Sequence, residues 1–302
     1  MILVTGAGGF VGRHVVKALL DRGCKVRCLV RSTDAAVNLL PDPVDIVLGN
    51  VNDKKSLKEA CQGVLVIIHL IAVIREHGED TFDKINVEGT KNLVEVAENS
   101  GVSQFLHLSA LGACDDPAYK YAYSKWQGEE FVKNSKLNWI VFRPSVIYGE
   151  GFGFLDRMLQ SVHMAPPPLV PVPGNGKTLF QPISVSDLVE CIMKTLLNDI
   201  AWNKVYEIGG PQHLSYREIL DILLNHLELK RMKIYIPSIL LKLVVPIMSY
   251  VLKDPPVTGV ELKQMKLNNT TALDAVERYF GFKPMPLMDG IKYLPKTKPA
   301  NR

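Results

Sequence analysis

The amino-acid sequence predicts an α/β protein in which a parallel β-sheet carries helices on both faces. Through the first half of the chain, short apolar runs alternate with amphipathic helical segments, and this alternation is typical of a doubly wound sheet. A glycine-rich turn joins the first apolar run to the first helix. After Pro144 the alternation becomes irregular, which predicts a smaller α/β lobe after the sheet.

The predicted elements of the sheet domain can be placed in order along the chain. Buried strands are expected where apolar residues run together, at 1–5, 25–30, 44–48, 64–70, 105–109 and 139–143. Helices are expected where apolar residues recur at helical spacing, at 10–22, 57–61, 86–100 and 121–135. Gly23 follows the first of these helices, as glycines at helix C-termini commonly do.

The second half is less regular. Its expected elements are two helices and a strand, at 185–197, 216–227 and 204–208. The proline- and glycine-rich segment 165–176 is expected to be a loop. We therefore expect a dinucleotide-binding domain at 1–150 and a smaller, mostly helical substrate or partner lobe at 151–302. Segment 177–210 is expected to return to the first domain.

Composition and charge indicate a globular chain that does not bind nucleic acid. Hydrophobic residues make up 47% of the 302 residues, and the net charge of +4 is spread along the chain. No run of lysine or arginine and no zinc-finger spacing is present, so neither nucleic acid nor a metal is an expected ligand. The five cysteines form no CxxC pair and are expected to be free thiols in a reducing compartment. Because residue 2 already belongs to the first strand, we expect no targeting segment and a cytoplasmic location.

One segment, 237–252, is strongly apolar. Lys242 and Pro246 interrupt it, and it is shorter than the roughly 20 residues that a membrane-spanning helix needs. One interpretation is a packed helix or a substrate lid. The other is an amphipathic contact with a membrane surface or a partner protein, which would make the chain peripheral to a membrane.

The glycine-rich turn, TGAGGFVG, places Gly6, Gly9 and Gly12 three residues apart between a strand and a helix. The first glycine permits a tight turn, the second lets the backbone approach a pyrophosphate, and the third lets helix and strand pack closely. The helix N-terminus then offers unpaired N–H groups and the positive end of its dipole to the phosphates. Because the turn lies between a strand and a helix, we expect it to bind NAD(H) or NADP(H).

The second strand indicates which dinucleotide is preferred. An acidic residue at its end would bind the ribose 2′-hydroxyl of NAD(H), but this strand ends in Val30, Arg31 and Ser32. The guanidinium of Arg31 could pair with a 2′-phosphate. We therefore expect NADP(H) to be preferred, with NAD(H) as the alternative. Arg13 could add to the same pocket or lie on the exposed helix face.

Tyr121 and Lys125 are four residues apart at the start of a predicted helix, so both project from one face. An ammonium beside a phenol favours the phenolate and is expected to lower the pKa of the tyrosine, which suits it to proton transfer. The lysine can also hydrogen-bond the nicotinamide ribose. The pair is therefore predicted to be catalytic.

Several segments resemble the extended members of the short-chain dehydrogenase/reductase superfamily, which are similar to NAD-dependent epimerases and dehydratases. The GxxGxxG spacing is the first of them. The others occur in the family's order and cover nearly the whole chain: HLIAV (69–73), NVEGTKNLVEVA (86–97), SALGA (109–113), YAYSKWQGEE (121–130), RPSVIYGEG (143–151), VPGNGKTLFQPISVSDL (172–188) and GFKPMPLMDGIKYL (281–294). The resemblance implies a Rossmann-type fold. SALGA, QP and PPVT are most similar to the branch of the nucleotide-binding accessory subunit of respiratory complex I and its bacterial relatives.

The resemblance also implies which residues surround the dinucleotide. Those implied at the pyrophosphate and the adenosine are Gly6, Gly9, Phe10, Val11, Gly12, Arg31, Asn50 and Val51. Those implied along the ribose–phosphate path and at the nicotinamide are Leu70, Ile71, Ala72, Tyr121, Lys125, Pro144 and Val146. His69 is expected to be a strand residue and Asn86 to tie loops together.

Ser109 has two interpretations. It ends the strand before the helix of Tyr121, where a hydroxyl could orient a substrate carbonyl or alcohol. Extended members usually carry several hydroxyl residues here, but Ser109 is followed by Ala110, Leu111 and Gly112. Ser109 is therefore either the third catalytic residue or a hydrogen-bonding residue at the strand end.

Two functions fit these observations. The first is an NAD(P)(H)-dependent oxidoreductase or sugar-nucleotide-type epimerase/dehydratase that uses Tyr121 as its acid/base. The second is a dinucleotide-binding structural or assembly protein of the complex I accessory type, with little or no turnover. The intact Tyr121–Lys125 pair favours the first. The second is favoured by Ser109, which is not followed by further hydroxyl residues, by segment 237–252 and by the resemblance to the complex I accessory subunit. The sequence identifies no substrate. A homodimer formed through the helices that carry Asn86 and Tyr121 is expected only by analogy with the resembling proteins.

Overall fold

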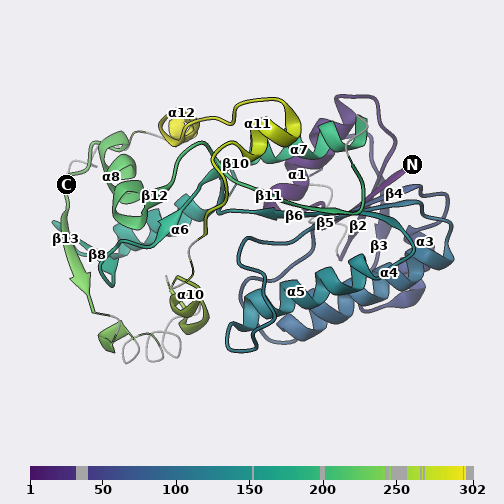
Figure 1. Ribbon diagram of the computed structural model, residues 1–302, viewed down its shortest axis with the longest axis horizontal. Helices are drawn as coiled ribbons and strands as arrows, with labels where there is room; N and C mark the ends of the chain where they lie inside the picture. Colours follow the sequence, from purple (N-terminus) through teal and green to yellow (C-terminus); the bar gives the residue numbers. More distant parts are fainter. Residues whose placement is uncertain are drawn as a thin grey trace. The chain divides into compact units, whose positions relative to one another are not determined.

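The computed structural model describes residues 1–31, 40–151, 153–197, 201–237, 239–241, 245, 257–265, 267, 269–294 and 296 (Figure 1). The chain divides into two compact units. The first consists of Met1–Pro144 and Leu188–Glu207, and the second of Ser145–Asp187 and Ile208–Arg302. Each unit has a hydrophobic core of its own.

The first unit is built on a seven-stranded sheet with the strand order β11-β6-β5-β4-β1-β2-β3. Its strands are β1 (Ile2–Thr5), β2 (Val26–Val30), β3 (Asp45–Leu48), β4 (Val66–His69), β5 (Gln104–Leu108), β6 (Asn138–Pro144) and β11 (Lys204–Ile208). Strands β1 to β6 all pair in parallel. The predicted parallel sheet is therefore confirmed, and the carboxyl ends of these strands lie at one edge.

Helices cover both faces of this sheet, as predicted (Figure 1). Helices α4 (Gly89–Asn99) and α5 (Lys120–Lys133) lie side by side over one face. Helix α1 (Phe10–Leu20) and most of α7 (Val185–Leu197) lie over the other. Strand residues between the two layers are fully buried, among them Leu3, Val4, Ile67, Ile68, Phe105 and Leu106. This burial on both faces explains why the strands are continuous apolar runs.

Two further helical segments differ from their expected bounds. The short helix α3 (Lys54–Ala60) begins before the expected 57–61 because the carboxylate of Asp53 accepts hydrogen bonds from the first-turn N–H groups. The segment η1 (Phe82–Glu88), a π-helix, leads directly into α4. Apolar spacing predicts which face of a helix is buried, but it does not predict where a polar residue such as Asp53 or Thr81 caps the N-terminus. The sequence therefore predicts later starts for both helical segments.

The second unit combines short strand pairs with short helices. Its strands are β7 (Ile147–Tyr148), β8 (Leu169–Pro173), β9 (Leu179–Phe180), β10 (Ile183–Ser184), β12 (Leu214–Ser215) and β13 (Met232–Ile236). Its helices are α6 (Phe154–Met164), α8 (Tyr216–His226), α10 (Gly259–Gln264), α11 (Ala275–Phe280), α12 (Leu287–Gly290) and the 3-10 turn η2 (Ile291–Tyr293). Its core includes Leu155, Val162, Val172, Ile219, Leu220 and Leu223.

The expectation of a loop at 165–176 is wrong, because β8 lies within it and pairs in parallel with β13. Val170 and Val172 are buried in the core of the second unit. The alternate positions of β8 hold Leu169, Pro171 and Pro173. Among the described residues β8 has a single strand neighbour, so its other edge tolerates prolines, which lack an N–H donor.

Most of the apolar segment 237–252 lies outside the described residues. Of the residues that are described, Ile239 and Leu240 are exposed and Val245 is buried. Within the described part of the chain, no helix is both long and apolar enough to cross a membrane. All five cysteines are free thiols, as predicted.

Candidate functional site

The glycine-rich turn between β1 and α1 is closed too tightly for side chains at two of its glycines. Gly6 has a φ of +77°, and a Cβ there would lie 3.0 Å from the backbone nitrogen of Ile71. A Cβ at Gly12 would lie only 2.1 Å from the carbonyl oxygen of Gly6. The N–H of Gly9 donates to that same oxygen at 3.0 Å. Only glycine therefore fits at positions 6 and 12 without moving the backbone.

The N-terminus of α1 has the properties of an anion site. Gly9 is the N-cap, it makes no side-chain cap hydrogen bond, and the first turn contains no acidic residue. Within the described part of the chain, the N-cap therefore offers no side chain to the N–H groups at the start of this helix, which include those of Phe10 and Val11. Together with the positive end of the helix dipole, they suit a pyrophosphate.

The residues expected along the dinucleotide follow strands that are neighbours in the sheet. Thr5 in β1 is in register with Leu29 in β2 and with His69 in β4. The turn at Gly6, the end of β2 and the segment after β4 consequently share the carboxyl edge of the sheet. The segment that follows β4 consists of Leu70, Ile71 and Ala72. It contacts the turn directly, since the N–H of Leu70 donates to the carbonyl oxygen of Thr5 at 3.1 Å.

The two residues expected beside the adenine follow β3 at this same edge. Asn50 is exposed. Val51 is 2% exposed, and its side chain lies in the core against Gly89, where a Cβ would be 2.7 Å from a methyl carbon of Val51. Any contact of Val51 with a ligand would therefore involve its backbone.

Arg31, expected at the adenosine phosphate, lies directly after β2. Its side chain is 66% exposed, and its guanidinium forms an ion pair with Asp80. One nitrogen, Nη1, donates to both carboxylate oxygens of Asp80, at 3.1 and 2.8 Å. The structure thus places the expected cation at the predicted edge, but with a carboxylate already bound to it.

Tyr121 and Lys125 lie on successive turns of α5. Lys125 is 2% exposed, and its Nζ donates to the carbonyl oxygen of Leu108 at the end of β5, at 2.8 Å. Burial lowers the pKa of Lys125 to about 8, although Glu129 acts in the opposite direction. The ring of Tyr121 packs edge-on against Phe82, with centroids 5.9 Å apart.

The expected fall in the pKa of Tyr121 is wrong for this structure. Burial raises the pKa of Tyr121 to about 12. The cause is desolvation of the phenolate by burial, while the ammonium of Lys125 is hydrogen-bonded to the carbonyl oxygen of Leu108.

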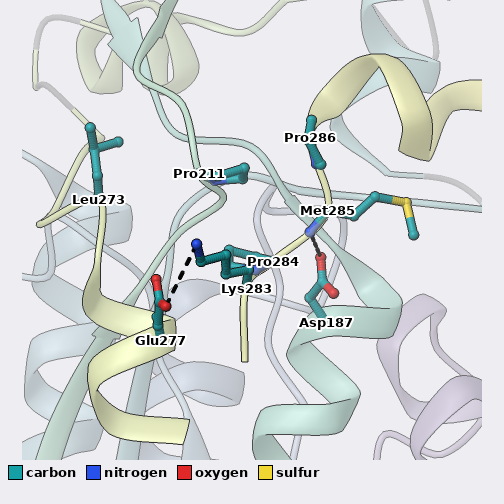
Figure 2. A pocket seen from close by; sticks show the side chains of 8 residues that line it. All are labelled: Asp187, Pro211, Leu273, Glu277, Lys283, Pro284, Met285 and Pro286. Carbon is teal, nitrogen blue, oxygen red and sulfur yellow. Dashed lines mark hydrogen bonds and ion pairs between the residues drawn. The ribbon is translucent and has the colours of Figure 1, made fainter. Parts of the chain in front are cut away.

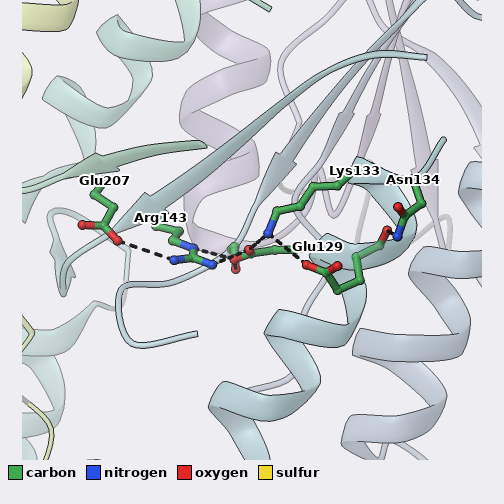
Figure 3. Close-up of polar contacts among 7 residues, drawn as sticks. Glu129, Lys133, Asn134, Arg143 and Glu207 are labelled. Atoms are coloured by element: carbon green, nitrogen blue, oxygen red, sulfur yellow. Dashed lines mark hydrogen bonds and ion pairs between the residues drawn. The ribbon is translucent and has the colours of Figure 1, made fainter. Parts of the chain in front are cut away.

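Ser109 is hydrogen-bonded to Glu129, which belongs to an ion-pair network with Arg143 and Lys133 (Figure 3). Its hydroxyl donates to Oε1 of Glu129 at 2.5 Å. Glu129 is 0% exposed, and Arg143 binds both of its oxygens, from Nε at 2.9 Å and from Nη2 at 2.7 Å. Lys133 lies 3.1 Å from Oε2, and Arg143 also reaches Glu207 at 3.5 Å. In this structure the hydroxyl of Ser109 is therefore hydrogen-bonded to the carboxylate of Glu129.

Comparison with known proteins identifies the family of this fold and site. Residues 2–209 match the model of the NAD dependent epimerase/dehydratase family. The chain belongs to this family. The predicted resemblance to extended short-chain dehydrogenases is therefore confirmed.

Two curated relatives and one solved structure illustrate the range of similar proteins. The chain is 32% identical to the ceramide reductase of Caulobacter vibrioides over 151 residues, which is 50% of this chain and 47% of that protein. It is 29% identical to the mitochondrial NADH dehydrogenase [ubiquinone] 1 alpha subcomplex subunit 9 of Arabidopsis thaliana over 229 residues, 73% of this chain and 56% of that protein. This chain thus matches about half the length of these relatives. The UDP-glucose 4-epimerase of Thermotoga maritima shares the fold, with a TM-score of 0.72 at 20% identity over 96% of each chain.

The residues of this epimerase/dehydratase-family chain fit the dinucleotide that its family uses. Two features suit a pyrophosphate: the glycine-rich turn, which a Cβ at Gly6 or Gly12 would fill, and the start of α1, which has no side-chain cap. The ammonium of Lys125 lies at the carboxyl end of β5, where it could bind a ribose hydroxyl.

Pro144 and Val146, both expected at the nicotinamide, belong to different units. Pro144 ends β6 in the first unit, and its carbonyl oxygen accepts a hydrogen bond from the N–H of Leu111 at 2.9 Å. Val146 belongs to the second unit, where its N–H donates to Oδ1 of Asn269 at 3.1 Å.

Two further residues of the sequence analysis have the structural roles expected of them. His69 is buried, with Nδ1 2.7 Å from Oγ1 of Thr5 and Nε2 3.1 Å from Oγ1 of Thr90. Burial lowers the pKa of His69 to about 3, so it is neutral at physiological pH. Asn86 donates to the carbonyl oxygen of Val73 and to Oγ of Ser124, both at 3.0 Å, and so ties a loop to α5.

Sequence reasoning missed three residues close to this site. Glu129 could have been found, because it lies four residues after Lys125 and four before Lys133 on one helix face. Asp80 and His107 gave no such signal. His107 stacks on His69 with ring centroids 5.3 Å apart, a contact between strands that no local spacing predicts.

The second unit contains an open pocket of about 560 Å³ (Figure 2). Asp187 lines it and accepts a hydrogen bond from the N–H of Met285 at 2.9 Å. Lys283 and Glu277 lie 3.9 Å apart beside it. None of the residues predicted from the sequence as site residues lines this pocket.

Proposed function

We propose that this chain is an NADP(H)-dependent oxidoreductase in which Tyr121 is the acid/base. The observation that carries the proposal is the position of Lys125. Its buried ammonium is hydrogen-bonded to the carbonyl oxygen of Leu108, at the same sheet edge as the turn of Gly6. Ligands of open α/β sheets bind at this edge, which supports a bound dinucleotide within reach of the Tyr121–Lys125 pair.

The proposed chemistry uses a small number of groups. When bound, the nicotinamide supplies or accepts the hydride. In the reductive direction Tyr121 donates its phenolic proton to the substrate carbonyl oxygen, and the ammonium of Lys125 stabilises the phenolate that is left. A pKa of about 12 keeps Tyr121 protonated at neutral pH, and this suits a proton donor. The name of the Caulobacter relative, a ceramide reductase, supports a reduction.

The preference for NADP(H) over NAD(H) belongs to the same proposal. It is supported by Arg31, which follows β2 where an acidic residue would favour NAD(H). A planar guanidinium is well suited to bind a phosphate through two hydrogen bonds.

A second candidate function is a dinucleotide-binding structural or assembly subunit. Two observations favour it. The hydroxyl of Ser109 is already bound by Glu129, and complex I subunits are among the relatives. In this alternative, the apolar segment 237–252 contacts a respiratory complex or a membrane surface.

The proposal is tested by following NADPH oxidation with carbonyls, quinones and oxidised sugar nucleotides as substrates. We expect turnover with at least one carbonyl compound, and a loss of at least a hundredfold in kcat for Tyr121→Phe with NADPH affinity retained, because the phenylalanine cannot transfer the proton. Tight NADPH binding without turnover on any substrate would contradict the enzyme proposal and favour the structural subunit.

A further inference from the structure

We propose that Asp80 is a second determinant of dinucleotide choice and that Arg31 and Asp80 together form a selector that accepts either cofactor. This inference rests on the proposed function and adds a residue to it. Arg31 alone would predict a simple preference for NADP(H). The carboxylate bound to its guanidinium changes that expectation.

The ion pair joins segments that lie on either side of the glycine-rich turn. Arg31 follows β2, whereas Asp80 lies in the connection between β4 and η1. In the sheet, β1 lies between β2 and β4, and the turn at Gly6 follows β1. The Arg31–Asp80 pair therefore spans the strand from which the phosphate-binding turn emerges.

The backbone of Asp80 is fixed by its own turn. His77 and Asp80 exchange two backbone hydrogen bonds, each 3.0 Å long. Gly78, inside this turn, has a φ of +56°, which favours glycine. The N–H of Phe82 donates to Oε1 of Glu76 at 3.1 Å and closes the far side. The loop thus holds its backbone in place, while the carboxylate can rotate toward or away from Arg31.

NADP(H) and NAD(H) would bind different members of the Arg31–Asp80 pair. The 2′-phosphate of NADP(H) carries negative charge and needs the guanidinium of Arg31, so it must displace Asp80 and is repelled by it. The ribose 2′-hydroxyl of NAD(H) is neutral and can donate to a carboxylate. Asp80 therefore supplies the acidic group that the end of β2 lacks, while Arg31 supplies the cation.

The Arg31–Asp80 ion pair is weak enough for either NADP(H) or NAD(H) to bind. Arg31 is 66% exposed and Asp80 is 32% exposed, so water and salt weaken their attraction. A phosphate with more charge than a carboxylate can then take over the guanidinium. The cost of displacing Asp80 reduces the preference for NADP(H) without abolishing it.

The test compares dissociation constants for NADPH and NADH in the full chain and in Asp80→Asn, which keeps the shape of the side chain and removes its charge. We expect NADPH to bind about three- to tenfold more tightly to the variant and NADH to bind more weakly. Adenosine 2′,5′-bisphosphate and adenosine 5′-monophosphate, used as competitors, should show the same opposite changes. Asp80 is part-exposed, and thermal unfolding checks that the variant is folded.

Glu79→Gln is the matched control. It removes a carboxylate from the neighbouring residue of the same turn, where Glu79 is exposed and pairs with Lys84 rather than with Arg31. We expect its ratio of NADPH to NADH affinity to stay within about twofold of the parent chain. An equal shift in both variants would mean that net charge alone is responsible, which would overturn the inference.

This experiment distinguishes failure of the Arg31–Asp80 selector from failure of the proposed function. If the parent chain binds a dinucleotide and Asp80→Asn leaves the affinity ratio unchanged, the selector is wrong and the proposed function stands. If the parent chain binds neither NADPH nor NADH, the proposed function is wrong and the selector with it.

Discussion

Lys125, Glu129 and Lys133 lie one helical turn apart on α5, and their charges alternate. Glu129 is fully buried, and an unpaired carboxylate there would be strongly unfavourable. Arg143 and Lys133 balance its charge, and the hydroxyl of Ser109 occupies a remaining acceptor site. At the residue scale, then, the buried carboxylate of Glu129 binds the candidate serine directly and raises the pKa of the candidate lysine through its charge.

This network gives opposite predictions for the two interpretations of Ser109. If its hydroxyl serves Glu129, Ser109→Ala removes a hydrogen bond to a buried charge and should lower the free energy of unfolding by about 1–3 kcal/mol. Turnover per folded molecule should then stay within about threefold of the parent. Chemical denaturation and NADPH oxidation measure the two quantities.

Ser103→Ala is the control, because Ser103 precedes the same strand and its hydroxyl donates an exposed hydrogen bond to the carbonyl oxygen of Leu65. Its free energy of unfolding should change by less than about 0.5 kcal/mol. Unchanged stability in Ser109→Ala, together with a loss of turnover of a hundredfold or more, would instead identify Ser109 as catalytic.

The buried lysine makes stability depend on pH. Burial lowers the pKa of Lys125 from its ordinary value of 10.5 to about 8. Below pH 8 the folded chain bears the cost of a buried ammonium, whereas above pH 10.5 the amine is neutral in both states and the cost is absent. Relative to Lys125→Met, the parent chain should therefore gain about 3 kcal/mol of unfolding free energy as the pH rises from about 8 to about 10.5.

Urea denaturation of both proteins at a series of pH values measures this difference. Lys17→Met is the control, since Lys17 is exposed and should give a difference from the parent that changes little over the same interval. Parallel curves for the parent and Lys125→Met would show that Lys125 keeps its ordinary pKa in the folded chain.

At the element scale, local sequence patterns predict the strands and helices of the first unit well. The strands are continuous apolar runs because both faces of the sheet are covered, and this leaves a plain signal in the sequence. The strand β8 was missed for a physical reason. Its prolines indicate a loop by composition, but they lie in a strand with a single neighbour, and the two valines between them are buried.

In the candidate site, too, the sequence predicts features that depend on neighbouring residues but not contacts between residues far apart in the chain. The spacing of Gly6, Gly9 and Gly12 and the offset from Tyr121 to Lys125 are local, so the sequence predicts where each group lies. The Arg31–Asp80 pair and the Ser109–Glu129 hydrogen bond join residues 49 and 20 positions apart. Tertiary folding alone brings these residues together, and the pKa values at the site follow from the burial it creates.

At the scale of the whole molecule, each unit has its own core and its own candidate features. The first unit contains the glycine-rich turn, the Arg31–Asp80 pair and the Tyr121–Lys125 pair, while the second contains the open pocket beside Asp187. The family model covers residues 2–209 and thus all of the first unit except Met1. The account therefore depends on dinucleotide binding by the first unit.

The most direct test of that claim is the dissociation constant of NADPH for Gly12→Ala beside Gly8→Ala. A Cβ at Gly12 would collide with the carbonyl oxygen of Gly6, whereas a Cβ at Gly8 meets nothing within 4 Å. With the folded fraction of each variant measured by thermal unfolding, we predict at least tenfold weaker binding for Gly12→Ala and a change within about twofold for Gly8→Ala. Equal affinity in the parent and both variants would contradict a dinucleotide bound at this turn.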